Sequence, residues 1–120
     1  MRFEDLTAWQ KARELTNAVY ALCKHKPLSS DFGLRDQLQR AAVSAMTNLA
    51  EGFERSHATE KLQFWNMARA SAGEVRSLVY VVRDNGLAAD DTSQAVQALA
   101  DEVGALNKGL IKSFKNKDRG

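Results

Sequence analysis

The sequence contains only one cysteine and one proline among its 120 residues. Cys23 therefore has no partner for an internal disulfide and no second thiol for a metal cluster, so the chain suits a reducing compartment. We expect Cys23 to be a buried, small apolar residue. The scarcity of proline and of β-branched runs argues against a fold of many short strands and favours long helices.

Long hydrophobic runs are missing as well. No stretch approaches the length of a membrane span. The first residues, "MRFEDLTAW", place Arg2, Glu4 and Asp5 where a signal peptide needs an apolar run. The sequence therefore predicts a cytoplasmic protein that makes no contact with a membrane.

Apolar residues recur every three or four positions in four segments, which is the spacing of a helix that buries one face. The predicted helices cover residues 5–25, 31–55, 59–85 and 91–114. The apolar stripe of the last helix comprises Ala95, Val96, Leu99, Val103, Leu106, Leu110 and Phe114. A chain of this length can bury one core without disulfide or metal support.

The breaks between these helices have local signals. Pro27 excludes a continuing helical turn, and residues 29–31 supply natural N-caps for the second helix. Asn85 and Gly86 form a C-terminal signal for the third helix, because such residues adopt the left-handed conformation that ends helices.

Four long helices with short connections favour an antiparallel up-down-up-down four-helix bundle, so the predicted fold class is all-α. We expect residues 1–115 to form this bundle as one domain. Residues 116–120, "NKDRG", are expected to form a flexible basic tail.

The first helix has a second, adjoining apolar face. It carries Trp9, Thr16, Tyr20 and Cys23 beside the main stripe. A lone bundle needs one apolar stripe per helix, so this excess predicts self-association. Trp9 and Tyr20 are the candidate residues for an oligomer interface.

A polar stripe runs along the second helix. Its side chains carry short or forked donors and acceptors, which suit a closely packed helix that satisfies its neighbours by hydrogen bonds. We expect a structural network in which Glu74 receives Arg40 in a bidentate pair. The network residues are Gln37, Arg40, Ser44, Asn48, Glu51 and Glu74. The alternative, a catalytic or ligand cluster, is not supported by any nucleophile or general base among them.

Basic residues gather in the second half of the chain, although the net charge is only +2. Arg69, Arg76 and Arg83 recur every seven residues on the expected exposed side of the third helix. Trp65 lies one turn before Arg69, and Tyr80 lies near Arg83. A basic ridge with aromatic neighbours can hold phosphates and stack bases. The last helix adds Lys108, Lys112 and Lys115. The alternative is a solvated face whose arginines pair with acidic residues of a neighbouring subunit.

Three stretches stand out together, "FEDLTAWQKARELTNAVY", "QLQRAAVSAMTNLAEGFER" and "FWNMARASAGEV". The pattern that they form over residues 3–87 resembles a small bacterial four-helix-bundle family, first known as proteins encoded in intervening sequences of 23S ribosomal RNA genes. The chain departs from that pattern at Met46, where members often have proline, and at Ala70, where they often have glycine.

The resemblance implies an antiparallel bundle that assembles as a ring, typically a homopentamer, with no accepted enzymatic activity. Relatives that accompany diversity-generating retroelements act as pentameric, basic, nucleic-acid-binding accessory proteins to a reverse transcriptase. By analogy we expect a non-enzymatic, self-associating accessory protein that binds RNA or DNA. The alternative is a structural scaffold that docks a protein partner. No metal, cofactor or catalytic residue is predicted.

Overall fold

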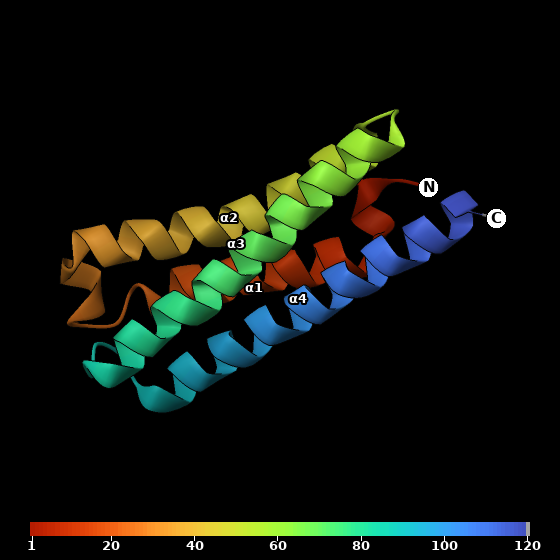
Figure 1. Ribbon diagram of the computed structural model, residues 1–120. Coiled ribbons are helices and arrows are strands. Elements are labelled where there is room, and N and C mark those ends of the chain that lie inside the picture. Colours follow the sequence, from red (N-terminus) through yellow and green to blue (C-terminus); the bar gives the residue numbers. More distant parts are fainter. Residues whose placement is uncertain (120) are drawn as a thin grey trace.

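The structure is a computed structural model that describes the backbone of residues 1–119 and the side chains of residues 1–117. Its helices form an elongated body of 50 × 20 × 19 Å (Figure 1). Two short 3-10 helices, η1 and η2, accompany four long α-helices. In chain order the elements are η1 (Phe3–Asp5), α1 (Thr7–Leu22), η2 (Leu28–Ser30), α2 (Phe32–Glu54), α3 (Ala58–Asp84) and α4 (Asp90–Arg119). The described residues contain no strand, which confirms the all-α class.

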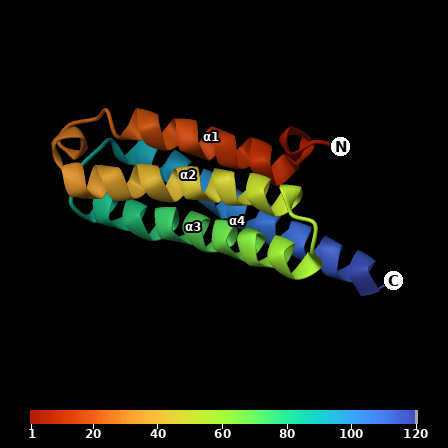
Figure 2. The same ribbon diagram turned by 90° about the horizontal axis from the view of Figure 1, so that it is seen from above.

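Each long helix packs against two others. α1 contacts α2 and α4, and α3 contacts the same two helices. The α1–α2 and α3–α4 connections lie at one end of the body, and the α2–α3 connection lies at the other (Figures 1 and 2). The four helices therefore form a bundle in which α3 and α4 lie side by side. None of the described helices is both long and apolar enough to cross a membrane.

Two predicted helix ends are confirmed. The Asp31 side chain is the N-cap of α2 and accepts a hydrogen bond from the backbone N–H of Leu34 at 3.2 Å. Gly86 follows α3 with a φ of 60°, and its N–H donates to the carbonyl of Arg83 at 3.3 Å. Glycine fits this left-handed position because it has no Cβ to clash.

The end of the chain differs from the prediction of a flexible tail. α4 continues to Arg119, so the described part of residues 116–120 extends the helix. The remaining residue of the predicted tail, Gly120, lies outside the described residues. Lys115 and Lys117 suit the C-terminal turns of α4, because cations near a helix C-terminus complement the helix dipole.

The core runs along the bundle axis and is built from leucine, valine and alanine. Its largest members, including Leu15, Leu38 and Val79, are fully buried. Cys23 belongs to this core, with 3% of its surface exposed, so its predicted role is confirmed. Burial raises the pKa of its thiol to about 11, which keeps it neutral and unreactive at neutral pH.

The stripe of α4 is rotated from the one predicted. Its buried residues are Ser93, Val96, Ala100, Val103, Asn107 and Ile111. Ala95 is exposed, and Leu99, Leu106, Leu110 and Phe114 lie at the edge of the core. The prediction followed apolar side chains only, so it missed the two polar residues that lie on the buried line.

Asn107 is fully buried, and neither atom of its amide has a hydrogen-bond partner among the described residues. An unpaired buried amide costs roughly 1 to 3 kcal/mol. We therefore expect Asn107→Leu, which keeps the branch at Cγ, to raise the free energy of unfolding by about 1 to 2 kcal/mol. Urea unfolding followed by circular dichroism measures this change. The same change at exposed Asn66 is the control, and a less stable Asn107→Leu would contradict the argument.

Candidate nucleic-acid interface

A groove runs between α3 and α4 and is lined by the basic residues of both helices. Three hollows of about 290, 340 and 410 Å³ follow one another along it. The first and second share Arg69 and Lys108 as lining residues. The second and third share Arg76 and Asp101. The hollows are therefore consecutive stretches of one groove, called here the α3/α4 groove.

The first stretch lies toward the C-terminal end of α4 and carries four cations. Arg69 of α3 lines it together with Lys108, Lys112 and Lys115 of α4, and no acidic side chain of the described residues lines it. Within residues 1–117, no ion pair involves any of these four side chains. All four are exposed. The structure thus brings together four of the predicted basic residues as a patch of uncompensated positive charge, the Arg69 end of the groove.

The opposite stretch is neutralised within the chain. Arg76 Nε lies 2.8 Å from Asp101 Oδ1. Arg83 donates to Asp90 at 2.9 Å and to the side-chain oxygen of Gln97 at 2.8 Å. The hydrogen bond from Arg83 is the main reason that the pKa of the Asp90 carboxyl is lowered. The three arginines of the predicted ridge are therefore not equivalent, and Arg76 and Arg83 find their acidic partners in α4 of the same chain.

Trp65 does not lie on the surface of the groove, so its prediction as a stacking residue is wrong. Its side chain is only 4% exposed, and its Nε1 donates to the carbonyl of Leu49 at 3.2 Å. Its ring meets that of Phe114 edge to face, with 5.3 Å between centroids. The reason is that α3 packs against both α2 and α4 and buries a wider arc than one stripe. Tyr80, 54% exposed, is the aromatic residue that lines the groove.

The polar stripe of α2 forms a smaller network than predicted. The hydroxyls of Ser44 and Ser71 share a hydrogen bond of 2.8 Å that joins α2 to α3. Asn48 Nδ2 donates to the hydroxyl and to the carbonyl of Ser44, both at 2.9 Å. These side chains are half-buried, and only the Ser44–Ser71 hydrogen bond connects the two helices, whereas the Asn48 bonds lie within α2.

The other members of the predicted network are exposed, namely Gln37, Arg40, Glu51 and Glu74. No ion pair joins Arg40 to Glu74 in the described part of the chain, so that prediction is wrong; hydration competes with such a pair in solvent. Glu51 instead pairs with Arg55, the C-cap residue of α2, at 3.2 Å. Among the side chains of residues 1–117, no group of three metal-ligating residues could hold an ion.

Trp9 is also buried, so its place on a free face of α1 is a wrong prediction. It is 9% exposed, and its ring lies edge to face with Phe3 at 5.2 Å between centroids. α1 packs between two neighbouring helices, which accounts for the burial of Trp9 without a second subunit. Tyr20 is 45% exposed, and its place in an oligomer interface stays a prediction.

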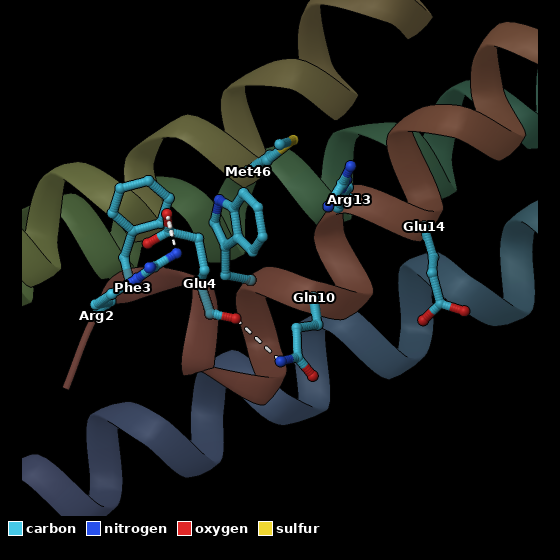
Figure 3. A pocket seen from close by; sticks show the side chains of 8 residues that line it. Arg2, Phe3, Glu4, Gln10, Arg13, Glu14 and Met46 are labelled. Atoms are coloured by element: carbon cyan, nitrogen blue, oxygen red, sulfur yellow. Dashed lines mark hydrogen bonds and ion pairs between the residues drawn. The ribbon is translucent and has the colours of Figure 1, made fainter.

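A larger hollow of about 830 Å³ lies where η1 and α1 meet α2 (Figure 3). Phe3 from η1 and Met46 from α2 line it, and Arg2 pairs with Glu4 at 2.9 Å beside them. Two arginines and two glutamates line this hollow, so its charges are balanced. It therefore offers an anion less attraction than the Arg69 end of the α3/α4 groove.

Comparison with known proteins agrees with this architecture. A crystal structure of a protein of unknown function from the S23 ribosomal protein family of Bacteroides thetaiotaomicron is similar, with a TM-score of 0.82 and 17% sequence identity. The similarity covers 88% of this chain and 99% of that one, and at this identity it shows the fold. No curated protein matches the chain.

The family match extends further toward the C-terminus than residues 3–87, over which the sequence motifs resemble the family. The sequence matches the family described as 23S rRNA-intervening sequence protein over residues 4–109. The match includes much of α4, which the motifs had left outside. The chain therefore belongs to the 23S rRNA-intervening sequence protein family.

Proposed function

We propose that this chain is a non-enzymatic accessory protein of the cytoplasm that binds nucleic acid through the Arg69 end of the α3/α4 groove. The observation that carries the proposal is the convergence of Arg69, Lys108, Lys112 and Lys115 around one hollow without an acidic partner in the described residues. Keeping four like charges together on a surface disfavours the folded state unless an anion is bound there. A polyphosphate backbone is an anion of the right extent.

We further propose that the bundle is antiparallel and that its copies assemble as a ring, typically of five subunits. The support is the family membership together with the resemblance described above. Repeating a weak basic patch around a ring raises overall affinity through effective concentration, without any new contact. An affinity too weak to be useful in one subunit becomes useful in the assembly.

The test is the triple variant Arg69→Gln, Lys108→Gln and Lys112→Gln. Each cation removed takes away up to one phosphate interaction, so we expect the affinity for RNA or DNA to fall by roughly ten- to one-hundredfold at about 0.1 M salt. The salt dependence of log K should become less steep by up to about 0.9 for each phosphate of a duplex that the variant leaves unneutralised. Fluorescence anisotropy with labelled nucleic acid, across a salt series, measures both quantities.

The matched control removes three exposed cations elsewhere, with Lys24→Gln, Lys26→Gln and Arg40→Gln. These lie near the α1–α2 connection and on α2, so they change net charge equally while leaving the groove intact. A control that weakens binding as much as the triple variant does would show that net charge alone drives binding. A wild-type protein that binds no nucleic acid at low salt would exclude the proposal.

The second candidate function is a scaffold that docks a protein partner. The observation that favours it is a set of large apolar side chains on the surface. Phe32 is 62% exposed, and Met67 and Val81 on α3 are 52% and 44% exposed. Exposed apolar surface of this kind marks protein contacts when it is contiguous. Failure of nucleic-acid binding would leave this function as the better account.

A further inference from the structure

We propose that the α3/α4 groove is selective for duplex over single-stranded nucleic acid, because it recognises the phosphate backbone and has no surface for stacking bases. This inference rests on the proposed function. It names the class of nucleic acid that the Arg69 end is built to hold.

The first observation is that, among the described residues, no aromatic side chain lines the Arg69 end of the groove. Binding of single strands depends on aromatic side chains on which successive bases stack. Trp65, the nearest tryptophan in sequence to Arg69, is buried against Phe114 and donates a hydrogen bond to the backbone carbonyl of Leu49. Tyr80 is exposed, but it lies three helical turns beyond Arg69 and lines the neutralised stretch of the groove.

The second observation is the spacing of the cations. Lys108, Lys112 and Lys115 lie on one face of α4 and span about 10 Å along its axis, because a helix rises 1.5 Å per residue. Arg69 lines the same hollow from α3. A duplex presents one phosphate charge per roughly 1.7 Å of its axis, a higher density than a single strand offers. When stacking contributes nothing, the ligand with the denser charge binds more tightly.

The third observation is the boundary of the cationic stretch. Arg76, the next arginine along α3, is held by Asp101 at 2.8 Å. The groove itself continues past this pair, because its third stretch lies beyond it and is lined by Tyr80, Arg83 and Gln97. Charge, and not space, therefore ends the phosphate-binding stretch at Asp101.

The experiment compares equal-length duplex and single-stranded probes, in DNA and in RNA, with the intact wild-type protein. We expect the duplex to bind about tenfold or more tightly at low salt. Tyr80→Ala should change neither affinity. Asp101→Asn should raise duplex affinity severalfold, because it frees Arg76 to contact a further phosphate while removing only an exposed ion pair. Light scattering on each variant checks that the assembly is unchanged.

The outcomes separate this inference from the proposed function. Equal or tighter binding of the single strand, abolished by Tyr80→Ala, would overturn the duplex preference and leave nucleic-acid binding in place. An unchanged duplex affinity in Asp101→Asn would overturn the boundary at Asp101. Binding of neither probe would overturn both the inference and the proposed function. Tighter binding of a DNA duplex than of an RNA duplex, or the reverse, would support the inference and identify which nucleic acid the groove prefers.

Discussion

Replacing Trp9 by alanine is expected to lower the free energy of unfolding by about 3 to 5 kcal/mol, the usual cost of truncating a buried tryptophan. Trp9 is 9% exposed, its ring meets Phe3 edge to face, and the guanidinium of Arg13 lies 5.8 Å from its ring centroid. The truncation therefore removes apolar burial, an aromatic pair and a cation–π interaction at once. Urea unfolding of the variant measures the loss of stability.

Tyr20→Ala is the control on the same helix. Tyr20 is 45% exposed, so we expect its truncation to cost less than about 1 kcal/mol. An equal loss of stability at the two positions would contradict the burial argument.

The exposed position also gives the better test of assembly. A change at Trp9 destabilises the fold, so a change in the mass measured by light scattering would not distinguish a lost interface from unfolding followed by dissociation or aggregation. Tyr20→Glu should stay folded, because its side chain lies at the surface. A smaller mass would place Tyr20 between subunits, whereas an unchanged mass would exclude it.

The four helices could be predicted from the sequence because two independent local signals, the spacing of apolar residues and the capping residues at helix ends, agree. The four helices follow from apolar spacing, and their ends at Asp31 and Gly86 follow from capping chemistry. What spacing could not supply is how far around each helix the burial extends. α1 and α3 each pack between two neighbours, so Trp9 and Trp65 are buried on faces that a single stripe leaves outside.

The candidate site was only partly predictable. Its cations are visible as a seven-residue repeat and a lysine-rich end, and the structure brings Arg69 together with Lys108, Lys112 and Lys115. The acidic partners were missed, although a signal for them exists. The chain folds back at the turn after Gly86. Residues of α3 and α4 that are about equally far from this turn in sequence therefore face one another, as Arg76 and Asp101 do. Charge matching across that turn distinguishes the neutralised arginines from Arg69.

Gly52 in the family motif has a structural role that its sequence does not reveal. It lies buried in the last turns of α2, where a Cβ would come within 2.5 Å of Trp65 Nε1 and 2.6 Å of Trp65 Cδ1. The ring has little freedom to move, because its Nε1 donates to Leu49 at 3.2 Å and its edge packs on Phe114. Glycine at this position therefore lets α3 bring the indole directly against the backbone of α2.

We expect Gly52→Ala to lower the free energy of unfolding by about 2 kcal/mol. In the variant, the added methyl group overpacks against Trp65 and distorts the hydrogen bond from Trp65 to Leu49. These two effects cost more than the roughly 1 kcal/mol that alanine gains over glycine in a helix. The control is Gly109→Ala in α4, where a Cβ meets nothing within 4 Å, so helix propensity alone acts and stability should rise by up to about 1 kcal/mol. Thermal and urea unfolding of both variants measure the change in the free energy of unfolding. A loss of stability in Gly52→Ala with a gain in Gly109→Ala would support close packing at Gly52. A gain of stability in both variants would show that the indole moves aside at little cost.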